Sequence, residues 1–381
     1  MKVLLSLLLS LALSLTTLAQ GIPKDSWPTY NGDYSGRRFS ANSKIDTSNV
    51  SRLGLAWVYR VNPGGNLRTT IKSTPLVVNG VMYFTIPDHV WAIDARSGRE
   101  IWHFAWTSKG GDHIGNRGVG IYGDALYVET PDCNLVALNL KDGKERWHQP
   151  ICDLNQMYFA SVAPIIVKNH VIVGVSGDDL DIPGYLQSRS AETGELQWQW
   201  NVEPKPGEPG SETWPNAEAM AHGGGMTWVP STYDPDLNLL FLGTGNPQPV
   251  IAGKGRKGDN LYTESIVALN PDTGKLAWHF QPSPHDTHDW DAVQTPVLFD
   301  GEVNGQPRKL LAQASRNGWF FVLDRTNGKN VITSEFVKTN WAKGVDAKGQ
   351  PIPNPAKEPQ LDGVLVSPNQ GGAANWPPPS F

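Results

Sequence analysis

A short phrase recurs five times along this chain and constrains its fold more than any other feature. Each copy has a few apolar residues, an Asp or Asn in most copies, a turn that ends in Gly, and then an apolar stretch that usually contains Trp. The copies run over residues 92–102, 137–147, 191–198, 268–278 and 322–328. A repeating unit of about 45–50 residues, built from strands and turns without helical periodicity, is typical of a β-propeller blade. Loops from many blades converge on the axis of a propeller, so we expect the chemistry at the axis.

The order of strands and turns predicts an all-β chain of about five blades with one additional N-terminal strand. The first blade is expected to use strands at 75–78, 81–85, 90–94 and 100–106, with turns at Asn79-Gly80 and Ser97-Gly98. The other blades are expected over about 117–151, 159–202, 221–281 and 292–335, and the N-terminal strand over 55–59. Such a strand commonly completes the last blade of a propeller. The polar, Pro- and Gly-rich segments 203–219 and 338–372 are expected to be long loops.

Composition and the first residues bound the class of protein. The net charge of −5 over 381 residues gives no reason to expect a nucleic acid or an anionic membrane as partner. A Met-Lys start and an apolar run to Leu15 resemble a secretory signal peptide, with cleavage expected after Ala19. Residues 20–381 would then form the propeller domain, in the periplasm or outside the cell. An uncleaved N-terminal anchor is the alternative.

The chain has two cysteines, Cys133 and Cys152, at either end of the last strands of the second predicted blade. In an oxidising compartment they can pair within that blade or remain free, and the sequence leaves both possibilities open. Since no Cys-x-x-Cys-His motif occurs, this chain carries no site for covalent haem attachment.

Polar residues that can serve a site follow apolar strands at several points. Asp179 and Asn246 come just after such strands, and 285–291 is the densest ionisable cluster of the chain. Carboxylate and amide oxygens suit a hard cation. Arg117 and Arg316 suit a planar anion, because guanidinium forms paired hydrogen bonds with carboxylates and carbonyl oxygens.

Several segments, taken together in their order and spacing, resemble the quinoprotein alcohol dehydrogenases. They are Asn116-Arg117-Gly118, Ser176-Gly177-Asp178-Asp179, 223–228 (GGGMTW), 243–247 (GTGNP), 285–291 (HDTHDWD) and Arg316-Asn317-Gly318. That family has periplasmic eight-bladed propellers that bind pyrroloquinoline quinone (PQQ) and a calcium or lanthanide ion. The resemblance runs from Trp27 to Phe381 and covers about the first two-thirds of a typical catalytic domain. We therefore expect a member of the family that is truncated at its C-terminus.

The resemblance implies a metal site formed by Asp179, Asn246 and Asp289. Asp289 also matches the catalytic base, which takes the proton of the alcohol and needs a pKa near the working pH. Asp291 matches the extra carboxylate of members that use lanthanides. The alternatives are a Gly-Asn-Pro turn at Asn246, competition from Asp178 for the place of Asp179, and a solvated polar turn over 285–291. A zinc site at the histidines of that turn is disfavoured, because no third soft ligand accompanies them.

The resemblance also implies a site for the quinone. Arg117 and Arg316 would contact its anionic groups, and Trp228 would form the aromatic floor on which its ring stacks. Further cofactor contacts are implied for Ser161, Ser176, Asn375 and Trp376. Surface ion pairs for the arginines and a blade-packing role for Trp228 are the structural alternatives.

Three departures from the family pattern stand against a simple transfer of function. The adjacent cysteine pair that covers the quinone in the family is absent, and Gly110-Gly111 stand near its place. Lys72 replaces an acidic cofactor contact, and Asp179 replaces a longer glutamate.

The expected function is oxidation of an alcohol in the periplasm by metal-assisted hydride transfer to PQQ, with Asp289 as base. A soluble or membrane-bound cytochrome c is the expected electron acceptor. A sugar or polyol dehydrogenase on the same scaffold is a further possibility. The alternative from a different class is a non-catalytic propeller with an empty or altered cofactor site, which serves as a binding or assembly scaffold.

Overall fold

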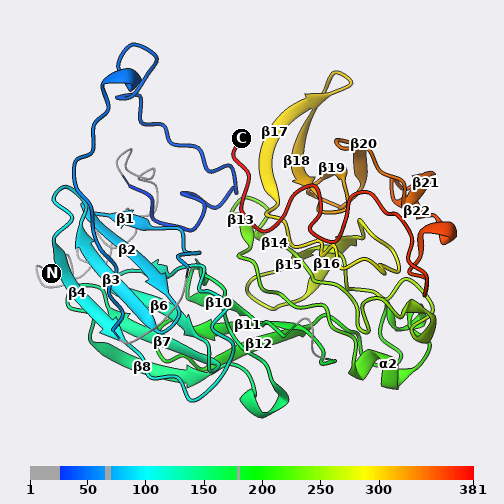
Figure 1. Ribbon diagram of the computed structural model, residues 1–381, viewed down its shortest axis with the longest axis horizontal. Helices are drawn as coiled ribbons and strands as arrows, with labels where there is room; N and C mark the ends of the chain where they lie inside the picture. Colours follow the sequence, from blue (N-terminus) through cyan, green and yellow to red (C-terminus); the bar gives the residue numbers. More distant parts are fainter. Residues whose placement is uncertain (1–25, 65–69, 178–180) are drawn as a thin grey trace, which may run out of the picture.

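The computed structural model describes residues 26–64, 70–177 and 181–381, and these form five consecutive four-stranded antiparallel sheets (Figure 1). Each sheet is a meander whose strands pair in chain order. The first two sheets contain β1 Leu76–Val78, β2 Val81–Ile86, β3 His89–Asp94, β4 Glu100–Ala105, β5 Gly120–Tyr122, β6 Ala125–Thr130, β7 Asn134–Asn139 and β8 Glu145–Pro150. The third and fourth contain β9 Ile165–Val167, β10 His170–Gly174, β11 Tyr185–Ser190, β12 Leu196–Asn201, β13 Thr232–Asp234, β14 Leu239–Gly243, β15 Ile266–Leu269 and β16 Leu276–Phe280. The fifth contains β17 Val297–Val303, β18 Gln306–Ala314, β19 Trp319–Asp324 and β20 Asn330–Glu335.

The remaining elements are short. A hairpin of β21 Ala342–Val345 and β22 Pro351–Pro353 follows the fifth sheet, and helix α2 Ala217–Ala221 lies in the long loop after β12. Single 3₁₀ turns occur at Val50–Arg52, Leu154–Gln156, Ser211–Thr213, Gly253–Gly255 and Pro355–Lys357. No helix of the described residues is long and apolar enough to span a membrane. The predicted signal peptide, 1–19, lies outside the described residues.

The predicted blades are confirmed, and local turn chemistry explains their accuracy. Between β1 and β2, Asn79 and Gly80 have φ values of +51° and +77°. A two-residue hairpin turn of this kind requires positive φ at both positions, which Asn and Gly tolerate best. The five sheets form an arc in which β5 lies against β9 and β13 against β17, so the first strand of each blade lies innermost.

The repeated Gly and Trp join each blade to the next. A methyl group built on Gly143 would lie 2.5 Å from the ring of Trp102 in the preceding blade. The Trp102 indole also donates a hydrogen bond to Leu140 O at 3.2 Å. The same close approach occurs for Gly194 with Trp147, Gly274 with Trp198, and Gly328 with Trp278. The repeat is therefore an inter-blade contact as well as a turn within each blade.

The prediction of an N-terminal strand over 55–59 is wrong for the described structure. This segment is extended but pairs with no strand, and Leu55 and Val58 are 84% and 76% exposed. A strand requires backbone hydrogen bonds to a neighbouring strand, and this segment packs its side chains against β2 and β3 without such pairing. Trp57 nevertheless makes the repeat contact, because a methyl group on Gly98 would lie 2.7 Å from its ring and its indole donates to Ala95 O.

Cys133 and Cys152 form a disulfide bond, with their Cα atoms 5.1 Å apart, which decides between the two possibilities that the sequence left open. The bridge joins the turn before β7 to the residues after β8. It fastens the second blade close to a buried cluster that includes Tyr158, Met226 and Trp228.

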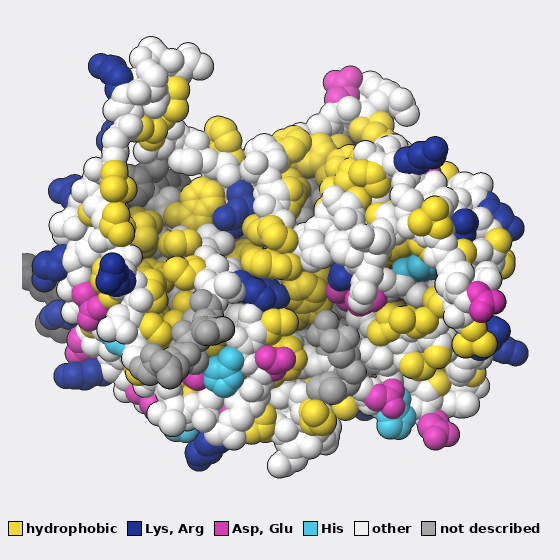
Figure 2. Space-filling model, viewed as in Figure 1, with side chains coloured by type: hydrophobic (Ala, Val, Ile, Leu, Met, Phe, Trp, Pro, Cys, Tyr) yellow, Lys and Arg dark blue, Asp and Glu magenta, His cyan; other side chains and the backbone are white. Residues whose placement is uncertain are grey.

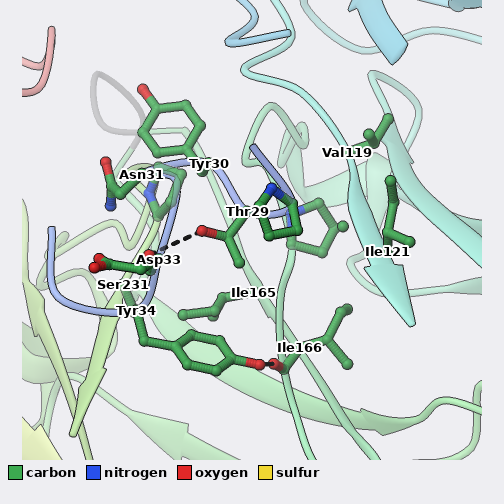
Figure 3. A pocket seen from close by; sticks show the side chains of 14 residues that line it. Thr29, Tyr30, Asn31, Asp33, Tyr34, Val119, Ile121, Ile165, Ile166 and Ser231 are labelled. Carbon is green, nitrogen blue, oxygen red and sulfur yellow. Dashed lines mark hydrogen bonds between the residues drawn. The ribbon is translucent and has the colours of Figure 1, made fainter. Parts of the chain in front are cut away.

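An N-terminal segment fills space between the inner strands of the second, third and fourth blades (Figure 3). Tyr34 reaches across to donate a hydrogen bond to Ile166 O at 2.7 Å, and Thr29 donates to Asp33 O at 2.8 Å. The cavity left beside them measures about 30 Å³, room for about one water molecule. This part of the axis is therefore packed, and a larger ligand needs a different place along it.

The C-terminal segment returns across the arc towards the N-terminal segment (Figure 1). Ala373 N donates to Arg316 O at 2.9 Å, and Phe381 N donates to Arg37 O at 2.8 Å. The predicted long loop over 338–372 is confirmed apart from its short hairpin. Its course brings residues near 370 to the loops of the fourth and fifth blades.

Candidate active site

The acidic loop between β16 and β17 is held by the carboxylate of Asp286, which is 3% exposed. This carboxylate accepts hydrogen bonds from the backbone N–H groups of His288 (3.1 Å), Asp289 (2.8 Å) and Trp290 (3.3 Å). Burial acts to raise the pKa of Asp286, but its hydrogen bond with His288 and nearby positive charge lower it below the usual value. Asp286 therefore shapes the turn, which is a role that the sequence did not predict.

The backbone conformation of Asp289 and Asp291 sets the direction of their side chains. Asp289 and Asp291 have φ values of +63° and +47°, in the left-handed region that L-residues seldom adopt. Between them Trp290 is fully buried, and its indole donates to Asn369 O at 3.1 Å. The buried Trp290 anchors the loop in the core, while the carboxylates on either side of it, Asp289 and Asp291, face Arg316. The burial of Trp290 in the core is thus compatible with a functional role for its neighbours.

Asn246 joins these two carboxylates in one group. Its backbone N–H donates to Asp291 Oδ1 at 2.8 Å. The side-chain atom of Asn246 that faces the carboxylates lies 3.2 Å from Asp291 Oδ1 and 3.3 Å from Asp289 Oδ1. In one orientation of the amide this atom is the nitrogen, which donates hydrogen bonds to both carboxylates. In the other orientation it is the oxygen, so that three acceptor oxygens, one from each side chain, face one another and require a cation between them. The donor set therefore fits a hard cation, with a 180° turn of the amide between the two states.

Arg316 balances part of this negative charge. Its guanidinium lies 2.8 Å from Asp291 Oδ2 and 3.6 Å from Asp289 Oδ2, and its side chain is 11% exposed. Gln370, on the returning C-terminal segment, donates to Asp289 Oδ2 at 2.5 Å. Sequence reasoning missed Gln370, because it lies 81 residues from Asp289 in a segment without periodicity.

Glu264 adds a further acidic side chain beside this group. It is 1% exposed, and neither carboxylate oxygen has a hydrogen-bond partner among the described residues. Burial raises its pKa well above the usual value, and the negative charges of Asp286, Asp291 and Asp289 act in the same direction. Nothing in the sequence marked Glu264, because acidic residues also precede other strands of this chain, such as Asp124 before β6.

The predicted quinone residues form a second group around Arg117, which is 5% exposed. Its guanidinium lies 4.5 Å from the centre of the Trp228 ring and 5.3 Å from that of Trp376. It also donates to Ser161 Oγ at 2.6 Å, and this hydroxyl lies 3.0 Å from Ser176 Oγ. Five of the predicted cofactor residues thus lie together, and the surface ion pair considered for Arg117 is excluded by its burial.

Backbone pairing connects the two groups. Gly225 N donates to Asn246 O at 2.8 Å, and Gly245 N donates to Met226 O at 2.9 Å. The segment that carries Trp228 therefore runs beside the one that carries Asn246. A cation at the first group and a flat ligand on Trp228 would be neighbours.

Other predicted residues lie apart from this arrangement or outside it. Asp179 falls outside the described residues. The Asn375 amide donates to Gly371 O and its oxygen accepts from Trp376 N, so its contacts are within its own loop. His285 bonds to Gly258 O, and His288 to Lys357 O. In the described part of the chain, no three His, Cys, Asp or Glu side chains form a metal-binding group by themselves.

Two departures from the family pattern have visible consequences. A methyl group on Gly111 would lie 1.9 Å from Pro131 O, so the backbone leaves no room for a side chain there. Lys72 packs its aliphatic chain over Gly115, and its pKa is lowered by burial and by the charge of Arg117. The cofactor region therefore has two neighbouring cations on this side.

Comparison with known proteins supports the same interpretation. The family model described as "PQQ: Glucose/ethanol/alcohol dehydrogenase, beta-propeller domain" matches residues 27–370. The quinohemoprotein alcohol dehydrogenase ADH IIB of Pseudomonas putida is 38% identical, over 98% of this chain and 58% of its own length. The quinohemoprotein alcohol dehydrogenase of Comamonas testosteroni is 40% identical, over 93% of this chain and 52% of its own length.

Solved structures agree with the fold. The crystal structure of the Comamonas testosteroni enzyme has a TM-score of 0.86 at 39% identity, covering 94% of this chain and 56% of that chain. A europium-containing methanol dehydrogenase has a TM-score of 0.86 at 30% identity, covering 94% and 67%. The chain thus spans little more than half the length of its quinohemoprotein relatives.

Proposed function

Because the chain belongs to the PQQ-dependent glucose, ethanol and alcohol dehydrogenase propeller family, we propose that it is the cofactor-binding part of a dehydrogenase that oxidises an alcohol. The observation that carries this proposal is the convergence of Asn246, Asp289, Asp291 and Arg316 beside the Arg117–Trp228 pair. A sugar or polyol is a possible substrate of the same site. The proposed location is the periplasm, with cytochrome c as electron acceptor.

Asn246, Asp289 and Asp291 would hold the cation, together with Asp179 by family resemblance. The three described side chains offer only oxygen to an ion when the amide turns, as calcium and lanthanides prefer. Asp291 is 1% exposed and partly neutralised by Arg316, so this carboxylate holds its charge away from bulk water.

Arg117, Ser161, Ser176, Trp228 and Trp376 would hold PQQ, with Arg316 at the boundary between quinone and cation. The Trp228 indole N–H is buried and has no acceptor among the described residues, which fits an acceptor-rich ligand at this place. The large flat indole suits stacking of a fused ring. A polycarboxylate suits the positive charge of Arg117.

PQQ with its cation would supply the hydride acceptor when bound. The protein's own task is then to remove the hydroxyl proton and to orient the alcohol. Asp289 has a side chain that is 15% exposed, so substrate can reach its carboxylate. Arg316 and Gln370 both contact Oδ2, which fixes the orientation of the carboxylate that would accept the proton.

A non-catalytic propeller remains the second candidate, and Lys72 with Gly111 favours it. Both change the region that the family uses to surround the quinone. On that alternative the same pocket would hold a different anion, or none.

Reconstitution separates the two functions. The full-length protein is mixed with PQQ and either calcium or lanthanum, and bound quinone absorbance is followed together with dye reduction by alcohols. Binding with turnover supports the proposal, and Asp289→Asn should then keep the absorbance while turnover falls by about 10²–10⁴-fold. Absence of quinone binding would favour the scaffold, and binding without turnover would exclude the role of Asp289.

A further inference from the structure

Glu264 occupies a position where the fold alone gives no reason for a carboxylate. Only Ser265 separates it from β15, and its backbone N–H donates to the carbonyl oxygen of Gly245, the residue directly before Asn246, at 2.9 Å. Its φ is +50°, so the chain is bent at this residue. The side chain is 1% exposed, and no described group donates a hydrogen bond to either carboxylate oxygen.

A buried carboxyl without a donor normally costs free energy that a Met or Thr would avoid. The contrast with Glu129 is informative, because that equally buried glutamate accepts a hydrogen bond from Val162 N at 2.7 Å. The nearby buried cation Arg256 does not serve Glu264 either. Arg256 donates to Pro249 O, Val250 O, Asn260 Oδ1 and Asp286 O.

The charges that surround Glu264 belong to the candidate cation site. Asp286, Asp289 and Asp291 repel its ionised form, and Arg316 attracts it. Since Arg316 is already shared between Asp289 and Asp291, the group has more carboxylates than cations. A bound metal ion would supply the missing positive charge.

We propose that Glu264 is a further carboxylate of the cation site and that it favours binding of a trivalent over a divalent ion. The inference rests on the proposed function, because it assumes that the ion binds between Asn246, Asp289 and Asp291. A negative charge attracts a trivalent ion more strongly than a divalent ion, and the difference in electrostatic energy corresponds to one unit of positive charge. With an assumed separation of roughly 10 Å and an effective dielectric constant of about 20, this amounts to about a tenfold change in the ratio of the two affinities.

The test measures metal affinity rather than turnover. Terbium is titrated into the full-length protein, its luminescence is excited through the tryptophans, and calcium is used as the competitor. Glu264→Gln keeps the shape of the side chain but cannot become negatively charged beside the ion. We expect its terbium-to-calcium affinity ratio to fall about tenfold. Glu203→Gln is the matched control, because Glu203 is also buried but lines a separate cavity with Asp153 and Lys205. Its ratio should equal that of the unchanged protein.

A second variant guards against misfolding as the cause. Glu264→Met should raise the unfolding temperature of the metal-free protein, because it removes a buried carboxyl without a donor, and should reduce the stabilisation that terbium gives. An unchanged affinity ratio in Glu264→Gln would overturn the inference, as would equal effects of Glu264→Gln and Glu203→Gln. Asp291→Ala distinguishes this failure from failure of the proposed function: a terbium affinity that is unchanged in Asp291→Ala would place the ion elsewhere.

Discussion

Replacement of Gly143 by Ala tests the physical basis of the repeat. Gly143 has φ of +68°, and an added methyl group would lie 2.5 Å from Trp102 Cε3 and 2.7 Å from its Cδ2. These atoms belong to a ring that is buried between the first and second blades. The substitution therefore forces the ring to move, or the two blades to separate.

The expected cost has two parts. Ala in the left-handed region costs about 1–2 kcal/mol. Displacement of a packed ring adds about 1–3 kcal/mol, the usual range for overpacking. Gly80 separates the two parts, because its φ is +77° and no heavy atom lies within 4 Å of the added methyl group. Gly80→Ala should lose only the part of the stability that comes from the backbone conformation.

The assay is thermal unfolding of full-length Gly143→Ala and Gly80→Ala by calorimetry. Gly143→Ala should unfold at the lower temperature, with a difference that corresponds to about 1–3 kcal/mol. If both variants lose the same stability, the Trp–Gly contact does not hold the blades together, and the interpretation of the repeat is refuted.

Three further predictions concern charge and covalent structure. Burial raises the pKa of Glu129 to about 8, so the folded protein retains a proton that the unfolded chain loses near pH 4.5. The stability of the folded state should therefore fall as pH rises from about 4.5 to 8. Glu129→Gln should flatten this part of a plot of unfolding temperature against pH. Asp291→Ala should weaken lanthanide use more than calcium use, since it removes charge from the cation site, and equal activity with both ions would contradict that argument. Reduction of the Cys133–Cys152 bridge should lower stability by about 3 kcal/mol, measured as a shift of the urea midpoint, because it frees a 19-residue loop in the unfolded chain.

The blades were predictable because their signals are local. Asn79 and Gly80 determine a hairpin turn through their backbone preferences. The contact between Gly143 and Trp102 recurs, with the corresponding residues, in every copy of the repeat. The segment over 55–59 was predicted wrongly since its apolar pattern is that of a strand, but pairing depends on a neighbour that pattern cannot supply.

The site was predictable only in part. Resemblance found Asn246, Asp289 and Asp291, and the structure brings these three together. The resemblance gave no indication of Gln370, which contacts Asp289 because a long segment without periodicity returns to the site. Glu264 was missed for another reason: the sequence shows its type, but only the packed structure shows that its carboxylate lacks a donor.

The most direct measurement is a crystal structure of the full-length protein soaked with PQQ and lanthanum, with anomalous scattering used to locate the ion. The account predicts one strong peak among the oxygens of Asn246, Asp289 and Asp291, with the quinone stacked on Trp228 next to it. A peak far from these three side chains, or a quinone that does not contact Trp228, would contradict it.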